Sequence, residues 1–220
     1  MPLATRPAAI IFDLDGTLVD TVGARIDAWA AVFAEYDIPV SRQQLAPMIG
    51  MDGRRLAVEV TAAANATLDE TGAEEIDRRA GEAFEERNRA PLPLSGAREA
   101  LARLKTAGVP WAIATSSRAQ QVASSVAALG LATPPRIIDG STVAHAKPAP
   151  DLLLLAARRL GVDAERCWYV GDSTWDMRAA VATEMLAIGV TAEASVGADD
   201  LRAAGAALVL ETLDDLEVPG

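Results

Sequence analysis

Cysteine and histidine are almost missing from this sequence: each occurs once in 220 residues. A single cysteine, Cys167, excludes a disulfide within the chain, and its position in an apolar run predicts a buried, unreactive thiol. Such cysteine usage is typical of the cytoplasm, where we expect this protein to be located. The one histidine, His145, is interpreted as a loop residue rather than a ligand.

Positive charge and long apolar runs are also scarce. Twenty Lys and Arg residues are set against 31 Asp and Glu residues, so the formal net charge is -11. Nucleic acids and anionic membranes bind clustered positive charge, and neither is expected as a partner. No apolar run approaches the length of a membrane span. The first run is interrupted by Asp13, which argues against a signal peptide.

Strand-like and helix-like segments alternate after Ser95. Such alternation predicts an α/β fold, a doubly wound parallel sheet with right-handed crossovers and helices on both faces. We expect strands at 8–13, 111–114, 136–138, 167–170, 186–190 and 207–210. We expect helices between them at 97–106, 118–129, 150–160, 176–182 and 198–203.

Between the first and second of these strands the pattern is helical throughout. Ser41, followed three residues later by Gln44, is typical of a capping box at a helix start. Pro91 and Pro93 mark the point where the chain returns to the sheet. The sequence therefore predicts two parts, a core of residues 1–18 and 91–220 and an all-helical segment of residues 19–90, called here the helical insert.

The end of the first strand carries two carboxylates. Asp13 and Asp15 are separated by one residue, so a strand would point them the same way. Gly16 follows and allows a sharp turn of the backbone. Carboxylates at the end of a buried strand are costly to desolvate unless a cation or hydrogen bonds compensate. The alternative is an ordinary turn, because Asp often ends strands.

Polar residues also follow the later strands, and ligands of open parallel sheets bind beyond the carboxyl ends of the strands. These residues are Thr115-Ser116-Ser117, Lys147, and the segment Gly171-Asp172-Ser173-Thr174-Trp175-Asp176. Each has a simpler interpretation: helix capping for the hydroxyls, a solvated amine for Lys147, and a helix N-terminus that favours negative charge for the aspartates. Their common location predicts one polar cluster.

Taken in order, the four segments resemble the four motifs of the haloacid dehalogenase-like phosphohydrolase superfamily, and the helical insert resembles its C1-type cap. The resemblance covers most of the chain and implies a Rossmann-like core. It implies that Asp13 is the nucleophile and Asp15 the general acid/base. It implies phosphate contacts and charge balance from Gly16, Thr115, Ser116 and Lys147. It implies Mg²⁺ as cofactor, with ligands from Asp13, Asp15 (through its backbone carbonyl), Asp172 and Asp176.

Two arginines are candidates for substrate recognition. Arg54 opens an expected helix of the insert, in the segment Gly50-Met51-Asp52-Gly53-Arg54-Arg55, and Arg118 follows the second motif. A guanidinium fork suits carboxylate or phosphate groups. Solvated surface arginines are the equally plausible alternative.

The expected function is that of an enzyme, a Mg²⁺-dependent phosphatase that hydrolyses a small phosphorylated metabolite through an aspartyl-phosphate. Asp15 argues against the family's dehalogenases and phosphonate-cleaving members, which usually lack this carboxylate. A sugar phosphomutase of the β-phosphoglucomutase type is an alternative, as is a non-catalytic phosphate-binding or phosphoacceptor protein. The sequence carries no sign of the oligomeric state. One departure from the family is the absence of the usual glycine in Ala182-Thr183-Glu184-Met185.

Overall fold

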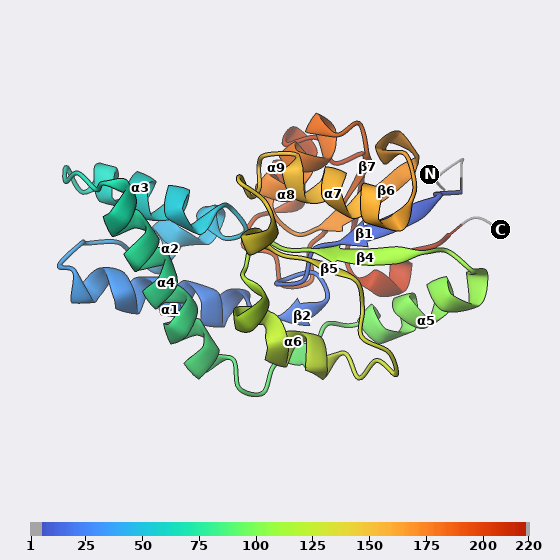
Figure 1. The fold of residues 1–220 in the computed structure, drawn as a ribbon, viewed down its shortest axis with the longest axis horizontal. Helices are drawn as coiled ribbons and strands as arrows, with labels where there is room; N and C mark the ends of the chain where they lie inside the picture. The colour runs from blue at the N-terminus through green and yellow to red at the C-terminus, as the bar shows by residue number, and fades with distance from the viewer. Residues whose placement is uncertain (1–5, 219–220) are drawn as a thin grey trace.

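The structure, a computed structural model, describes residues 6–218. A six-stranded parallel sheet with helices on both faces forms one end, and the helices of the insert lie together at the other (Figure 1). The predicted α/β fold with a doubly wound parallel sheet is confirmed.

The sheet has the strand order β5-β4-β1-β6-β7-β8. Its strands are β1 (Ala9–Phe12), β4 (Trp111–Ala114), β5 (Ile137–Ile138), β6 (Cys167–Gly171), β7 (Leu186–Val190) and β8 (Leu208–Leu210). From β1 the chain builds outward to β4 and β5, and then returns to the other side of β1 with β6. The strand order therefore reverses between β1 and β6, which is where open α/β sheets bind their ligands.

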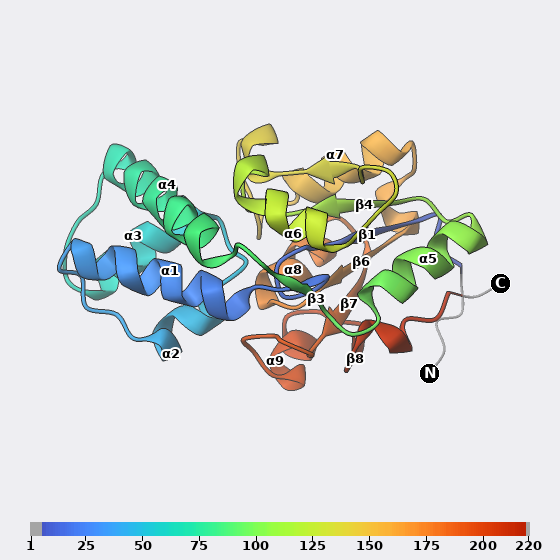
Figure 2. The same ribbon diagram turned by 90° about the horizontal axis from the view of Figure 1, so that it is seen from below.

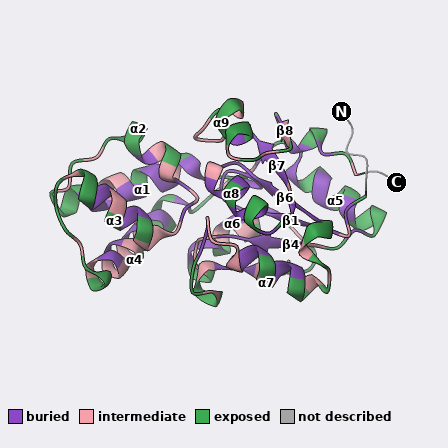
Figure 3. Cartoon of the chain, turned by 90° about the horizontal axis from the view of Figure 1, so that it is seen from above, coloured by how far each residue is buried: buried purple, intermediate pink, exposed green. Residues whose placement is uncertain are grey.

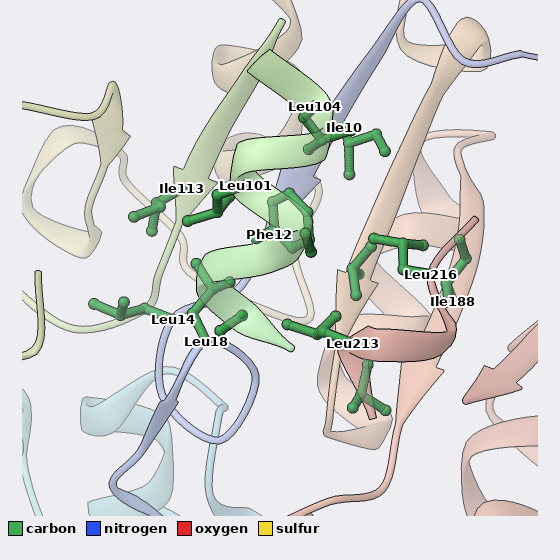
Figure 4. Close-up of a cluster of buried hydrophobic side chains, with 14 of the residues drawn as sticks. Ile10, Phe12, Leu14, Leu18, Leu101, Leu104, Ile113, Ile188, Leu213 and Leu216 are labelled. Atoms are coloured by element: carbon green, nitrogen blue, oxygen red, sulfur yellow. The ribbon is translucent and has the colours of Figure 1, made fainter. Parts of the chain in front are cut away.

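Alternation along β1 explains why both faces of the sheet are covered. Ile10 and Phe12 belong to one hydrophobic cluster, and Ala9 and Ile11 to a second on the opposite face. Figure 4 shows the first cluster, in which Phe12 lies close to the side chains of the helix above it. All four side chains are fully buried, and the strands form the buried centre of Figure 3. Cys167 is buried in the second cluster, as predicted.

The core helices divide between these two clusters. The first cluster is covered by α5 (Ala97–Ala107), α6 (Ala123–Ala128) and the 3₁₀ turns η2 (Ala119–Val122) and η5 (Leu213–Asp215). The second is covered by α7 (Asp151–Leu160), α8 (Thr174–Ala182) and α9 (Ala198–Ala203). Short 3₁₀ turns also occur at η3 (Gly140–Thr142) and η4 (Ala164–Arg166). The one continuous helix predicted over 118–129 is therefore wrong in detail, because η2 and α6 divide it.

The helical insert has its own hydrophobic cluster. Its elements are α1 (Val22–Glu35), α2 (Arg42–Leu45), the 3₁₀ turn η1 (Ala46–Met48), α3 (Gly53–Ala63) and α4 (Glu70–Arg87). Trp29 stacks on Phe33 at 5.6 Å between ring centroids, and both belong to the same cluster as Ile76 of α4. Trp175 of α8 joins this cluster, so the insert also packs on the core.

Two short strands connect the insert to the core. β2 (Val19–Asp20) pairs antiparallel with β3 (Leu92–Pro93), and Figure 2 shows both chain crossings side by side. This pair was not anticipated from the sequence, because two residues are too few to show a periodicity. The exact limits of the two parts stay a prediction.

The structure shows what becomes of two local sequence features, the capping box at Ser41 and the missing glycine near Glu184. The capping box at Ser41 is present, with the Gln44 amide donating to the serine hydroxyl. After α8, Glu184 adopts φ +59°, a left-handed conformation at the place where the family glycine is absent. Among residues 6–218, no helix combines the length and the apolar character needed to span a membrane.

Candidate active site

The first-motif carboxylate lies at the point where the strand order reverses. Asp13 follows β1 directly, and its amide donates to the Val170 carbonyl of β6 at 2.8 Å. Both sheet neighbours of β1 also end here: Thr115 follows β4 and Asp172 follows β6. The parallel register of β1 with β4 and β6 therefore gathers three of the four motifs.

Lys147 brings the remaining motif into the same place. Its ammonium is completely buried and lies 2.7 Å from Asp13 Oδ1 and 2.7 Å from Asp176 Oδ1. Burial opposes the charge on Lys147, but Asp13 and Asp176 outweigh it and raise the pKa of the amine. A buried amine that remains charged supplies a fixed positive charge beside the nucleophile.

Asp176 is held by several donors. Besides Lys147, the Tyr169 hydroxyl donates to its Oδ1 at 2.7 Å. The amide and hydroxyl of Ser173 donate to its Oδ2 at 3.0 and 2.6 Å, which closes the capping box of α8. Both carboxylate oxygens are thus engaged, an arrangement that positions Lys147. Tyr169 was missed by the sequence analysis, because a tyrosine within a buried strand gives no sign of what its hydroxyl contacts.

Asp172 has fewer partners. The Thr17 hydroxyl donates to its Oδ1 at 2.9 Å, and its Oδ2 lies against Gly16. A Cβ on Gly16 would be 2.4 Å from that oxygen, and Gly16 has φ +81°, so glycine is required there for two reasons. The predicted role of Gly16 in phosphate binding stays a prediction; its observed role is to bring the first-motif turn against Asp172.

The three carboxylates fit a cation. One oxygen each of Asp13, Asp172 and Asp176 lies within 4.8 Å of the others. Asp13 Oδ1, although close to Lys147, accepts no well-directed hydrogen bond from any described residue. Burial, with Asp176 nearby, raises the pKa of Asp13 to about 7 against the attraction of Lys147. Burial, Asp176 and Asp13 together raise the pKa of Asp172 well above its ordinary value. This uncompensated negative charge is what a hard divalent cation with oxygen ligands would neutralise.

Asp15 is in a different environment. Thr21 and Ser117 donate to it at 2.8 and 2.9 Å, and Arg25 Nη2 is 2.6 Å from its Oδ2. Burial favours the protonated form, but Arg25 and these hydrogen bonds outweigh it and lower the pKa of Asp15. In this arrangement Asp15 is a carboxylate ready to accept a proton.

Arg25 is the main site residue missed by the sequence analysis. It belongs to α1 of the insert, is 8% exposed, and lies 3.4 Å from the centroid of the Phe84 ring. It also donates to the Ser117 hydroxyl at 2.7 Å, so it joins the insert to the core. A signal was present: Arg25 is four residues before Trp29, on the apolar face of its helix, where an arginine needs a partner.

The second-motif hydroxyls point in two directions. Thr115 is buried, lines the cavity described below, and accepts a hydrogen bond from the Ser117 amide at 3.1 Å. Ser116 donates to the Gly50 carbonyl of the insert at 3.0 Å. Neither hydroxyl caps the helical turn that follows, because the amide donor to Thr115 lies before that turn. Their predicted phosphate contacts stay a prediction.

The two candidate arginines of the sequence analysis are both in ion pairs. Arg118 pairs with Glu74 and Asp77 of α4, the latter at 3.0 Å. Arg54 pairs with Asp52 at 3.3 Å and donates to the Ala144 carbonyl at 3.2 Å. Arg118 lines the cavity over the catalytic carboxylates, but Arg54 is not among its lining residues. Direct contact of Arg54 with a substrate in this cavity is therefore not supported.

A small cavity of about 50 Å³ lies between the insert and the motif residues. Its floor is formed by residues of the first three motifs, and its roof by residues of the insert. The floor includes Asp13, Asp15, Thr115, Ser116, Ser117 and Lys147, and the roof includes Arg25, Trp29, Ile49, Met51, Leu56 and Asp77. The amide of Asp52 donates to the Lys147 carbonyl at 2.9 Å, and Trp175 Nε1 donates to the Pro47 carbonyl at 2.9 Å. These hydrogen bonds hold the insert over the site.

Comparison with known proteins agrees with this geometry. Residues 7–182 match the model of the haloacid dehalogenase-like hydrolases. The chain is 32% identical over 197 residues to the phosphoglycolate phosphatase of Xanthomonas campestris pv. campestris (strain 8004), covering 88% of this chain and 87% of the relative. It is 30% identical over 186 residues to the fructose-1-phosphate phosphatase YqaB of Escherichia coli (strain K12), covering 84% and 97%. The crystal structure of a hydrolase from Pseudomonas syringae is similar with a TM-score of 0.88 and 30% identity, covering 94% of each chain.

Proposed function

We propose a reaction for this chain, which belongs to the haloacid dehalogenase-like hydrolase family and is a phosphatase like its named relatives. In this proposal it hydrolyses a small phosphate monoester with Mg²⁺ through an aspartyl-phosphate on Asp13. The observation that carries the proposal is the placement of Asp13 beside the buried ammonium of Lys147 and the carboxylate of Asp172. The match to the family model and the named relatives confirm, at the level of the family, the resemblance drawn from the four motifs.

The first half of the reaction uses Asp13 and Asp15. A carboxylate oxygen of Asp13 forms a bond to phosphorus, the bond from phosphorus to the ester oxygen breaks, and the leaving oxygen takes a proton from Asp15. Lys147 stabilises the negative charge of the transferring group. Arg25 holds Asp15 as a carboxylate, so Asp15 can carry a proton only if substrate binding loosens the contact between Arg25 and Asp15.

The second half reverses the role of Asp15. It accepts a proton from water, the water oxygen bonds to phosphorus, and the acyl-phosphate bond breaks to release phosphate and restore Asp13. Arg25 and the hydrogen bonds that lower the pKa of Asp15 keep it as a carboxylate, so the base form is present at neutral pH.

The metal ligands in this proposal are the side chains of Asp13 and Asp172 and the backbone carbonyl of Asp15. Mg²⁺ bound there would offset the repulsion between a carboxylate nucleophile and a phosphate dianion. Asp176 remains a candidate ligand, but its hydrogen bonds to Lys147, Tyr169 and Ser173 favour the positioning of Lys147.

In this proposal the helical insert covers the reacting groups and excludes water during phosphoryl transfer. The cavity of about 50 Å³ admits only a few water molecules. A substrate therefore enters only if the insert moves away from the core, and its return would isolate the reacting groups.

Hydrolysis of p-nitrophenyl phosphate tests the proposal. We expect turnover with Mg²⁺, none with EDTA, and a loss of roughly four orders of magnitude or more in kcat for Asp13→Asn. Asp20→Asn, which changes an exposed carboxylate nearby in the sequence, is the matched control and should retain full activity. Full activity of Asp13→Asn would rule out the aspartyl-phosphate.

A further inference from the structure

The roof of the catalytic cavity shows which kind of alcohol the site can accept. The insert contributes four apolar side chains there, Trp29, Ile49, Met51 and Leu56. Apart from the indole N–H of Trp29, these side chains offer no hydrogen bonds to a charged leaving group. The polar groups of the roof therefore determine which charge on the substrate's alcohol part the site can accept.

The guanidinium groups lining the cavity are already neutralised by carboxylates of this chain. Arg25 is 2.6 Å from Asp15, and Arg118 is paired with Glu74 and with Asp77. The third cation, Lys147, lies between two carboxylates beneath the position of the phosphoryl group. Among the described residues that line the cavity, every cation already has a carboxylate partner that offsets its charge.

Asp77 is the carboxylate of the roof whose hydrogen-bonding capacity is not fully used. Its Oδ2 accepts a hydrogen bond from Arg118, whereas its Oδ1 accepts none from the described residues. Asp77 Oδ1 packs directly against Gly53, where a Cβ would be only 1.9 Å away, and both residues line the cavity. The roof therefore contains one carboxylate oxygen that has no hydrogen-bond donor among the described residues.

An adjoining polar cleft of about 210 Å³ adds further negative charge. It shares Asp77 and Arg118 with the catalytic cavity and is also lined by Asp52, Arg54 and Glu74. Three carboxylates there face two guanidinium groups, so a leaving group that extends this way meets an acidic surface.

We propose that the substrate's alcohol part is uncharged or cationic and donates a hydrogen bond to Asp77, as a polyhydroxy or amino alcohol does. An alcohol part with a carboxylate or a second phosphate is selected against. The inference rests on the proposed function and names its substrate class. It disfavours phosphoglycolate, and it disfavours the phosphomutase alternative, because a mutase must hold the second phosphate of a sugar bisphosphate.

Three phosphate esters of nearly equal size test the charge preference: 2-phosphoglycolate, 2-hydroxyethyl phosphate and phosphoethanolamine. They place a carboxylate, a hydroxyl and an ammonium group at the same distance from phosphorus. With wild-type protein and Mg²⁺, we expect kcat/KM for the hydroxyl and ammonium esters to exceed that for phosphoglycolate by about tenfold or more. An equal or higher value for phosphoglycolate would overturn the inference and leave the proposed function intact.

Asp77→Asn tests the residue itself. Removal of its charge should lower kcat/KM for phosphoethanolamine and reduce its advantage over phosphoglycolate by about fivefold or more. The matched control is Glu82→Gln, an exposed carboxylate of the same helix, which should leave the ratio unchanged. If the ratio of kcat/KM for phosphoethanolamine to that for phosphoglycolate is unchanged in Asp77→Asn, Asp77 does not recognise the alcohol part. If this variant does not fold, the three esters with wild-type protein still decide the charge preference. Failure to hydrolyse these esters and p-nitrophenyl phosphate alike would overturn the proposed function, and the inference with it.

Discussion

Two aspartates of one motif differ in what they contribute to the folded protein. Asp176 accepts hydrogen bonds from Lys147, Tyr169 and Ser173, whereas the only donor to Asp172 among the described residues is Thr17. Asp176 is therefore part of the buried framework. Asp172 is a buried charge that is costly until a cation neutralises it.

We expect opposite effects on stability from the same substitution at these two positions. Asp176→Asn removes one of the two carboxylate charges that Lys147 pairs with and should lower the free energy of unfolding by about 3 kcal/mol. Asp172→Asn relieves repulsion and should raise it for the metal-free protein by on the order of 1 kcal/mol. Urea denaturation in EDTA measures both, and both variants should lose most activity. A large destabilisation by Asp172→Asn would contradict this interpretation.

Arg25 gives a second prediction at this scale, concerning the pH dependence of turnover. Removing a positive charge 2.6 Å from Asp15 raises the pKa of that carboxyl, so less of the base form is present in weakly acidic solution. For Arg25→Gln we expect the acid limb of the kcat profile to move to higher pH by about one unit, with a lower maximum. Arg79→Gln, which changes a partly exposed arginine of the same insert, is the control and should keep the wild-type profile.

The site residues that the sequence predicted are those that occur in short, ordered motifs. Asp13, Asp15 and Lys147 were identified because each follows a strand or stands in a motif of fixed order. Arg25 and Tyr169 were not, because their roles depend on contacts between segments far apart in the chain. Periodicity identifies the buried face of a helix or strand but not the polar partner that a residue finds there.

At the scale of elements, the strands were predicted well and the turns less so. Short apolar runs such as Trp111–Ala114 were predicted as strands at the observed positions. The segment 118–129 was predicted as one helix but begins with a 3₁₀ turn, where Gln121 accepts a hydrogen bond from the Arg118 amide. Helix periodicity does not distinguish the two, because both bring residues three apart onto one side.

The ends of α7 and α8 allow a matched pair of substitutions. Gly161 follows α7 with φ +74° and free space around its Cα, whereas Glu184 takes φ +59° after α8. A side chain in the left-handed conformation costs about 1 kcal/mol relative to glycine. Glu184→Gly should therefore stabilise the protein by about 0.5–1 kcal/mol, and Gly161→Ala should destabilise it by about 1 kcal/mol.

Thermal unfolding of both glycine variants, with activity as a second measurement, checks this pair. Neither residue contributes to the catalytic cavity, so kcat should be unchanged in both. A loss of stability on Glu184→Gly would mean that the glutamate makes a stabilising interaction that outweighs its backbone conformation.

At the scale of the whole molecule, the placement of the insert on the core was beyond prediction from sequence. The pairing of Arg118 with α4 and the contact of Arg54 with the Ala144 carbonyl depend on how two separately packed parts meet. Nothing in the local pattern of either part specifies that orientation. For this reason the sequence left both arginines as candidates for substrate recognition or for the solvated surface, whereas in the structure they join the insert to the core.

The buried carboxylates also make the stability of the whole protein depend on pH and on Mg²⁺. The pKa of Asp13 rises from 3.8 to about 7 on folding, and that of Asp172 also rises. Between the pKa of Asp13 in the unfolded chain and its pKa in the folded protein, the folded state binds more protons than the unfolded state. The free energy of unfolding of the metal-free protein therefore falls as pH increases through this range. The lowered pKa of Asp15 acts in the opposite direction, but only in acid near its ordinary value.

Mg²⁺ should therefore stabilise the protein more at about pH 8 than at about pH 5.5, where protons compete for the same oxygens. Binding at a hundred times the dissociation constant contributes about 2.7 kcal/mol, which corresponds to a rise in Tm of roughly 5–10 °C for a chain of this size. Thermal scans in EDTA and in saturating MgCl₂ at both pH values measure the difference, and Asp172→Asn should abolish most of it. An equal Mg²⁺ effect at the two pH values would show that the ion binds away from these carboxylates, and the metal site proposed here would then be wrong.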